Sequence, residues 1–401
     1  MTTGTQRISR NKLLGIAGTG WMFDAMDVGI LSFVIAAIAV DWQLSPSEMG
    51  WIGSVNSIGM AVGAFGFGLL ADRIGRKQVF MLTLVLFSVA SGLSAATTTL
   101  AAFLALRFLV GAGLGGELPV ASTLVSESVS AKERGRVVVL LESFWAAGWL
   151  LAALIAYFII PDYGWRIALV LTALPAFYAI YIRRNLPDSP KFVQEGKPKE
   201  TIGSKMRGLW SKKYARRTLM LWIVWFTVVF SYYGMFLWLP SVMVLKGFSM
   251  IKSFGYVLLM TLAQLPGYFT AAWLIEKVGR KFVLATYLLG TAASALAFGN
   301  ADTLAMLMLS GALLSFFNLG AWGALYAYSP EQYPTAIRAT GSGMAAAVGR
   351  IGGIFGPLLV GWMLAADYGF GIIFGIFCGA IVIGVLAVVL LGTETKQMEL
   401  E

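Results

Sequence analysis

Blocks of about 20 consecutive apolar residues repeat along this chain, separated by short polar stretches. An α-helix needs a block of that length to cross the hydrocarbon core of a bilayer. Of the 401 residues, 58% are hydrophobic and 12% are charged, whereas soluble domains carry roughly 25% charged residues. The chain is therefore predicted to be an all-α integral membrane protein that crosses the bilayer many times.

Windows of about 19 residues predict twelve membrane-spanning helices. The predicted spans are 13–40, 50–71, 78–97, 100–125, 137–160, 166–184, 218–245, 253–275, 282–299, 303–328, 339–364 and 368–391. The first block is long, contains two aspartates and lacks a small-residue cleavage site. It is predicted to be a retained span rather than a signal peptide.

The basic residues predict how the chain is oriented. With the N-terminus inside, most of the 30 Lys and Arg residues fall in cytoplasmic loops, as the positive-inside rule requires. Both termini are therefore expected in the cytoplasm, with the protein in the cell membrane. The long basic segment 185–217 is predicted to be a cytoplasmic linker between six-helix domains at 1–184 and 218–401. Contact with anionic lipid explains its charge better than nucleic-acid binding does.

The chain lacks the residues of most enzyme sites. It has no histidine, and its one cysteine, Cys378, lies in an apolar block. A His/Cys metal site, an imidazole base and an intrachain disulfide are excluded. We expect no cofactor, no bound metal and no enzymatic activity.

Two loops of the chain repeat each other. GLLADRIGRK (68–77) is matched by AWLIEKVGRK (272–281), which gives an offset of 204 positions from 72 to 276. The pairs related by this offset are Asp72 and Glu276, Gly75 and Gly279, Arg76 and Arg280, Glu127 and Glu331, Arg134 and Arg338, and Gly148 and Gly352. The two six-helix halves are predicted to be a parallel repeat, with a ligand site between them near the bilayer midplane.

These residues carry a resemblance that covers nearly the whole chain. GLLADRIGRK is similar to the loop signature of the major facilitator superfamily, and RFLVGAGLGG (107–116) looks like its helix 4 motif. LPDSPKF (186–192) and GTETK (392–396) resemble segments of the sugar-porter branch. Four further segments resemble the group of aromatic-acid symporters, synaptic vesicle protein relatives and, most closely, bacterial niacin permeases. They are GTGWMFDAMDVGIL (18–31), GGELPVA (115–121), LLESFWAAG (140–148) and GRIGGIFGP (349–357).

The resemblance implies a secondary transporter of the major facilitator fold that works by alternating access. It also implies a gating role for charged residues at the cytoplasmic helix ends, where ion pairs would hold the halves together when that side is shut. These residues are Asp72, Arg73, Arg76, Glu127, Arg134, Glu276, Arg280, Glu331 and Arg338. The alternative is that they only determine the topology.

Ionisable residues at membrane depth are costly and mark candidate functional groups. Asp24 and Asp27 lie three residues apart on the first helix, and Arg107 is the expected partner of Asp27. The resemblance implies that Asp27 and Arg107 are the proton-coupling pair. A static ion pair that only orients two helices is the alternative.

Glu142 occupies the position at which sugar porters typically carry a substrate-binding glutamine. A carboxylate there, with Tyr232 and Tyr233 in place of a glutamine pair, disfavours a hexose substrate. Glu142 is a candidate second proton site or a hydrogen-bond acceptor for substrate. Glu117 lies at a similar depth and is its candidate alternate partner. Two carboxylates so close together would favour the protonated form of one of them.

Arg350 lies halfway through the eleventh predicted helix, where an unpaired guanidinium is prohibitive. No acidic residue lies at that depth in the second half of the sequence, so either a substrate carboxylate or a cross-domain partner must balance the charge. The candidate side chains around such a ligand are Trp145, Trp149, Tyr232, Tyr233, Asn318, Trp322 and Tyr326. Rings beside a fixed cation suit a small flat aromatic acid.

The sequence therefore predicts a proton-coupled importer of a small aromatic carboxylate, with niacin as the best single candidate. Its partners would be that substrate, protons and the lipid bilayer, and a monomer is expected to be the working unit. The alternatives are a carrier of hydroxybenzoate-type acids or sugars, a drug exporter, or a membrane receptor or interaction protein that has lost transport.

Overall fold

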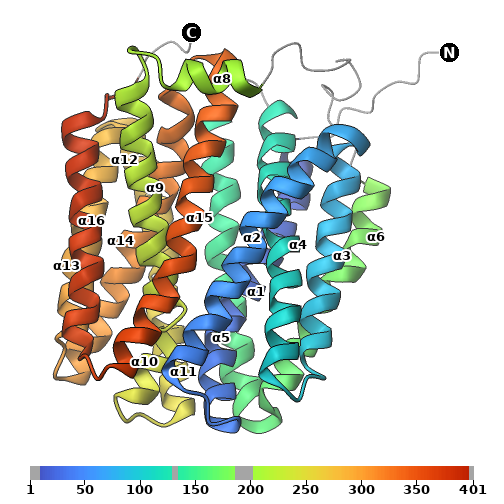
Figure 1. The fold of residues 1–401 in the computed structure, drawn as a ribbon, viewed down its shortest axis with the longest axis vertical. Helices are drawn as coiled ribbons and strands as arrows, with labels where there is room; N and C mark the ends of the chain where they lie inside the picture. Colours follow the sequence, from blue (N-terminus) through green and yellow to red (C-terminus); the bar gives the residue numbers. More distant parts are fainter. Residues whose placement is uncertain (1–9, 129–133, 186–201, 397–401) are drawn as a thin grey trace.

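The computed structural model describes residues 10–128, 134–185 and 202–396, and each regular element in those ranges is an α-helix. The helices run side by side along the long axis of the molecule (Figure 1). The start of α1 (Arg10–Asp41), the end of α16 (Phe370–Leu391) and the short α8 (Ile202–Leu209) lie together at one end. We call this the terminal end and the opposite one the distal end.

The remaining helices follow the order of the predicted spans. They are α2 (Pro46–Ile74), α3 (Arg76–Ser94), α4 (Leu100–Ser128), α5 (Arg134–Leu171), α6 (Pro175–Asn185), α9 (Ala215–Phe236), α10 (Leu239–Leu245), α11 (Met250–Leu262), α12 (Gln264–Lys277), α13 (Arg280–Gly299), α14 (Leu304–Glu331) and α15 (Thr335–Ala365).

The described helices account for the twelve predicted crossings. Nine helical stretches within the described ranges are long and apolar enough to span a bilayer. One of them, Leu140–Ile182, has 43 residues and turns at Gly164, where φ is 81°, so it makes two crossings. The remaining two are α2 and α4, of 29 residues each. The all-α, twelve-span prediction is therefore confirmed.

Three predicted spans are interrupted rather than continuous. The sixth is broken before α6, the seventh between α9 and α10, and the eighth at Ala263, between α11 and α12. Each break is followed closely by a proline, namely Pro175, Pro240 and Pro266. A proline has no N–H to donate to the carbonyl four residues earlier, so the helical ladder is interrupted there.

Helix packing follows the predicted repeat. In the first half, α1 packs on α5, α2 on α4 and α3 on α6; in the second, α9 packs on α15, α12 on α14 and α13 on α16. The loop glycines also agree, because Gly75 and Gly279 have φ values of 99° and 111°, a region that favours glycine. The sequence repeat is therefore also a structural repeat.

Two seams join the halves, one between α2 and α15 and the other between α5 and α11. Near the distal end, Ser54 of α2 donates from Oγ to the carbonyl of Ile354 on α15, at 2.6 Å. On the other side, the rings of Phe33 on α1 and Phe254 on α11 meet edge to face, with centroids 5.1 Å apart. The halves are thus packed against each other toward the distal end.

Candidate functional site

A buried ion pair lies inside the first half. Arg107 of α4 and Asp27 of α1 are fully buried, and Nη1 of Arg107 lies 3.4 Å from Oδ2 of Asp27. Ser91 of α3 donates its hydroxyl proton to Oδ1 of Asp27 and accepts a 2.9 Å hydrogen bond from Nη2 of Arg107. Arg107 also donates to Ser94, at 3.1 Å, and Thr172 bonds Ser91 at 2.6 Å. The predicted contact between Asp27 and Arg107 is therefore present.

We call these five residues the aspartate network. Burying a charged pair is costly unless its remaining hydrogen-bonding capacity is used. Here Arg107 donates to one carboxylate oxygen of Asp27, and the hydroxyl of Ser91 donates to the other. Ser91, Ser94 and Thr172 were not predicted from the sequence, because a hydroxyl in a membrane helix more often bonds its own backbone.

Asp24 takes a different direction from Asp27. It is buried, and it lies close enough to the hydroxyl of Tyr233 on α9 to interact with it electrostatically. Three residues along a helix rotate a side chain by about 60° from its starting face. Asp27 therefore contacts residues of the first half, whereas Asp24, about 60° away on the same side of α1, interacts with a residue of the second half.

A cluster of aromatic rings crosses between the halves. The indole N–H of Trp145 on α5 donates to the hydroxyl of Tyr232 on α9, at 2.8 Å. The ring of Tyr232 lies 4.8 Å from that of Trp322 on α14 and 5.2 Å from that of Tyr233. Trp149 meets Tyr232 edge to face, with centroids 6.2 Å apart. Five of the rings predicted to line the cavity thus lie together.

Arg350 of α15 lies beside this cluster. Its Nη1 donates to the hydroxyl of Tyr233, at 3.3 Å, and lies 3.7 Å from the sulfur of Met60 on α2. None of the carboxylates whose side chains the structure describes forms an ion pair with it. Tyr326 lies within electrostatic range of both Arg350 and Glu142. The fixed cation that the sequence predicted therefore has aromatic neighbours but no anion among the described side chains.

Glu142 of α5 is fully buried, and the indole of Trp21, which interacts with its carboxylate, does not reach full hydrogen-bond geometry. Its neighbours are Trp21 of α1, Tyr268 of α12 and Tyr326 of α14. The indole of Trp21 stacks obliquely on Trp145, with centroids 4.8 Å apart. Glu117, its predicted alternate partner, lies outside the described side chains.

Two further buried polar side chains extend the site toward α12. Gln264, the first residue of α12, and Tyr268, one turn later, are buried, and their polar side-chain atoms have no described hydrogen-bond partner. The same is true of both amide atoms of Asn318. Gln264 and Tyr268 were not predicted as site residues from the sequence. The feature that could have indicated Gln264 is a polar residue two positions before Pro266 inside an apolar block.

We call the residues between the halves the seam site. It comprises Trp21, Asp24, Glu142, Trp145, Trp149, Tyr232, Tyr233, Gln264, Tyr268, Asn318, Trp322, Tyr326 and Arg350. They come from both halves; most lie near the middle of their spans, and Glu142 and Tyr326 lie closer to the terminal end. The predicted midplane location between two repeats agrees with this arrangement.

The gating residues of the second half are paired within that half. Arg280 bonds Glu331 through Nε, at 3.2 Å, and Glu276 through Nη2, at 3.1 Å. Thr395 donates to Glu331 at 2.6 Å, and Arg338 donates from Nε to the carbonyls of Pro330 and Tyr333. The first-half members lie outside the described side chains; they are Asp72, Arg73, Arg76, Glu127 and Arg134. The predicted pairing across the halves therefore stays a prediction.

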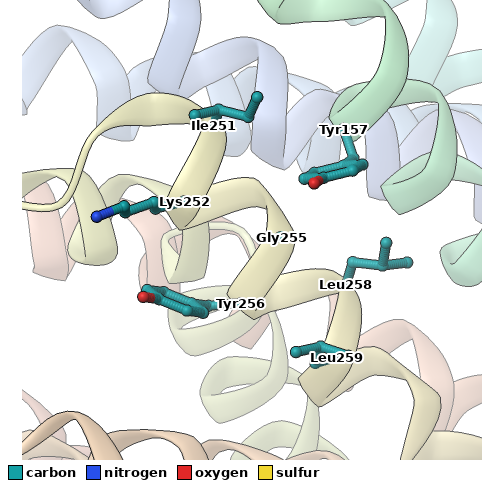
Figure 2. A pocket seen from close by; sticks show the side chains of 7 residues that line it. All are labelled: Tyr157, Ile251, Lys252, Gly255, Tyr256, Leu258 and Leu259. Carbon is teal, nitrogen blue, oxygen red and sulfur yellow. The ribbon is translucent and has the colours of Figure 1, made fainter.

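A separate pocket of about 460 Å³ opens between α5 and α11 (Figure 2). Its lining residues are Tyr157, Ile251, Lys252, Gly255, Tyr256, Leu258 and Leu259. The lining is mostly apolar and contains none of the predicted site residues, so the pocket is distinct from the seam site.

Comparisons with known proteins identify the family of the chain. The sequence pattern of the Major Facilitator Superfamily matches residues 18–263 and 255–400. A protein of Bacillus subtilis (strain 168), provisionally named niacin/nicotinamide transporter NiaP, is 69% identical over 99% of this chain and 99% of its own length. The niacin transporter NiaP of Acinetobacter baylyi is 50% identical over 97% of this chain and 95% of its own.

A solved structure shows the same fold. The xylose transporter XylE of E. coli, in a partially occluded inward open conformation, superposes with a TM-score of 0.78 at 19% identity and covers 98% of this chain and 99% of that one. The named relatives are transporters, which agrees with the exclusion of enzyme chemistry from the composition. The chain is a multi-pass membrane transporter and belongs to the major facilitator superfamily.

Proposed function

We propose that this transporter imports nicotinate together with protons, and that the seam site binds the substrate. The names of the two relatives support the solute, since one is a niacin transporter and the other is assigned niacin and nicotinamide. A monomer is the proposed working unit. We further propose domains at 1–184 and 218–401, the linker 185–217 and a cytoplasmic terminal end, all in a cell membrane.

The observation that carries this proposal is the environment of Arg350. A guanidinium at membrane depth requires an anion, and none of the described carboxylates pairs with it. A guanidinium binds a carboxylate through two parallel hydrogen bonds, which fix the plane of the ligand. The rings of Tyr233, Trp322 and Tyr326 lie close by, where a flat heteroaromatic ring would pack.

The aspartate network supports proton coupling. Asp27 is its only carboxylate among the described residues, and a proton on Asp27 would weaken its attraction to Arg107. Loss of that attraction frees α1 and α4 to shift relative to each other. Asp24 also lies on α1 and interacts with Tyr233 of the second half. A shift of α1 on protonation of Asp27 would therefore change that interaction in the seam site.

The packing supports an inward-facing conformation. Contacts between the halves are formed toward the distal end, where Ser54 bonds Ile354 and Phe33 meets Phe254. With a cytoplasmic terminal end, the seam site would open to the cytoplasm in this conformation. Alternating access then requires these distal contacts to break while the terminal end closes.

A binding screen of the purified protein tests the substrate. A ligand that binds only the folded protein raises its Tm by an amount that grows with the logarithm of the ratio of ligand concentration to Kd. We expect nicotinate to raise Tm and a hexose to leave it unchanged. Nicotinamide keeps the ring but lacks the carboxylate, so it should shift Tm less. A hexose shift equal to that of nicotinate would overturn the proposal.

A further inference from the structure

Helices α2 and α15 converge toward the distal end (Figure 1). A Cβ added at Gly353 of α15 would lie 3.6 Å from Oγ of Ser57 on α2. One turn nearer the terminal end, Nη1 of Arg350 lies 3.7 Å from the sulfur of Met60. A Cβ added at Gly343, two turns further, would have nothing within 4 Å. Arg350 and Met60 therefore lie between the part of this seam that is in contact and the open space at Gly343.

Three hydrogen-bond donors converge on the sulfur of Met60. Besides Nη1 of Arg350 at 3.7 Å, they are the hydroxyl of Tyr233 on α9, also at 3.7 Å, and Nδ2 of Asn56 on α2, at 3.9 Å. Nη1 of Arg350 also donates to the hydroxyl oxygen of Tyr233, at 3.3 Å. Because all three distances end at one atom, the three donors surround a single position.

A thioether sulfur is a poor partner for these donors. It is only a weak acceptor, and it carries no charge that could balance a guanidinium. Met60 is 3% exposed and Asn56 is 1% exposed, so bulk water reaches neither side chain. Oδ1 of Asn56 has no hydrogen-bond partner among the described residues. Buried polar groups without good partners are costly, so this position favours a stronger acceptor than sulfur.

A carboxylate oxygen meets the needs of this position. It is ionised, it accepts more than one hydrogen bond, and it attracts the guanidinium. Hydrogen bonds to an ionised oxygen are about 2.7–2.9 Å long, so an oxygen in place of the sulfur would draw each donor about 1 Å closer. For the oxygen to enter, the side chain of Met60 has to turn away, which its unbranched, flexible chain allows.

We infer that Asn56, Tyr233 and Arg350 form an anion subsite in which a carboxylate oxygen of the substrate replaces the sulfur of Met60. The inference rests on the proposed function, because it takes the substrate to be an aromatic carboxylate bound at Arg350. It assigns two residues of α2: Asn56 binds the carboxylate, and Met60 occupies the subsite when no substrate is bound. Asn56 belongs to the first half and its two partners to the second, so a carboxylate bound here draws the halves together.

The first test measures the affinity of the purified full-length protein for nicotinate and for nicotinamide, which has the same ring but no charged oxygen. A hydrogen bond to a charged group contributes more than one between neutral groups. Asn56→Leu, which removes the donor at similar volume, should lower nicotinate affinity at least about tenfold and nicotinamide affinity at most about fivefold. A purely structural role for Asn56 would lower both by the same factor. Asn300→Leu, at an exposed amide that bonds the carbonyl of Leu296, should change neither.

The second test follows Met60 itself. Leucine has a similar volume but no sulfur, so Met60→Leu removes the acceptor from the free protein and leaves all three donors for the carboxylate. Nicotinate affinity should stay at the wild-type level or rise. With the methionine methyl groups labelled with carbon-13, the Met60 signal is identified by its absence in this variant. In wild type that signal should move when nicotinate is added.

The outcomes separate the subsite from the proposed function. If Asn56→Leu leaves the ratio of the two affinities at its wild-type value, or if saturating nicotinate leaves the Met60 signal in place, the subsite is overturned while a nicotinate transporter remains. If wild type does not bind nicotinate, the proposed function and the subsite fall together. Should Asn56→Leu not fold, Asn56→Ala removes the same amide, and the Met60 signal of wild type still decides.

Discussion

The aspartate network and the seam site are both buried at membrane depth, but their polar groups are satisfied to different degrees. In the network, one carboxylate oxygen of Asp27 accepts from Ser91 and the other from Arg107. In the seam site, Gln264 and Asn318 have no described hydrogen-bond partners, and the indole of Trp21 does not reach full hydrogen-bond geometry with Glu142. A satisfied cluster can persist without a ligand, whereas unsatisfied buried groups favour one that completes them.

The two regions also differ in what happens to them when the halves move. The aspartate network is built entirely from α1, α3, α4 and the sixth span, so it travels with the first half. The seam site is built from both halves, and bonds such as that from Trp145 to Tyr232 must rearrange in each cycle. A cluster that lies within one half suits the coupled proton, whereas a cluster between the halves suits the transported solute.

The largest expected effect comes from removing the titratable group of the network. Asp27→Asn keeps the shape of the side chain but cannot gain or lose a proton. In proteoliposomes, nicotinate accumulation driven by a pH gradient should fall to the level of empty liposomes. Exchange of labelled for unlabelled nicotinate across the membrane should persist, because exchange needs no net proton movement.

Asp41→Asn is the matched control. Asp41 lies near the distal end, half exposed, and pairs with Arg166 at 3.4 Å and with the indole of Trp165 at 3.1 Å. Its variant should accumulate nicotinate as wild type does. Full accumulation by Asp27→Asn would remove the coupling role from the network and transfer it to Glu142 or Asp24.

The next effect concerns the cation of the seam site. An ammonium group cannot reproduce the two parallel hydrogen bonds of a guanidinium, so Arg350→Lys should weaken nicotinate binding about tenfold or more. Nicotinamide, which lacks the carboxylate, should lose much less. Isothermal titration of both ligands measures the difference, and an unchanged unfolding temperature shows that the fold is intact.

Arg166→Lys is the corresponding control at the distal end, because Arg166 is 43% exposed and pairs with Asp41. It should bind both ligands as wild type does. If Arg350→Lys binds nicotinate normally, Arg350 is a structural residue of the seam, and the difference between the two regions loses its main support.

The charged residues of both regions could be predicted from the sequence because a charged side chain at membrane depth needs a partner of opposite charge. The pair of Asp27 and Arg107 could be predicted because burying either charge alone in the membrane is too costly. The lack of an acidic partner for Arg350 in its own half could be predicted because no acidic residue lies at its depth there. The twelve spans followed from hydropathy because the bilayer leaves the backbone few alternatives.

The uncharged parts were harder to predict. Hydropathy averaged over a window passes smoothly through Ala263 and Gln264, so both the break and the buried amide were lost, although Pro266 marked the place. Ser91 and Thr172 were missed because a hydroxyl in a helix bonds either its own backbone or another side chain. Thr172 has both kinds of partner, the carbonyl of Leu169 and Ser91, each at 2.6 Å.

A smaller effect is expected at the bond that joins the halves inside the seam site. Trp145→Phe and Tyr232→Phe each remove the 2.8 Å hydrogen bond between α5 and α9 while leaving a ring in place. Each should lower nicotinate affinity about three- to fivefold, because the bond no longer holds the two rings in place for the ligand, an effect no larger than one neutral hydrogen bond of about 1 kcal/mol. Because both variants lose the same bond, the double variant should lose no more than either single one.

Trp225→Phe removes a bond of the same kind, from the indole to Ser329 at 2.9 Å, but both of its partners lie in the second half. It should change stability more than affinity. Additive losses in the Trp145 and Tyr232 cycle would show that the two side chains contact the ligand separately rather than through each other.

The smallest expected effect concerns the terminal end. Glu331 is partly buried and joins Arg280 to Thr395, so Glu331→Gln should loosen contacts that hold the helix ends of the second half.

Gly343 has open space around it and lies seven residues before Arg350, on the same face of α15, so a cysteine there reports on access to the seam site. In a Cys378→Ala background, Gly343→Cys should react about two- to threefold faster with a membrane-impermeant maleimide when Glu331→Gln is added, as expected for a pair worth about 0.5 kcal/mol. Glu48→Gln, at the distal end, should leave that rate unchanged. Equal rates with and without Glu331→Gln, together with normal transport, would show that the charged residues of the second half determine topology and do not gate.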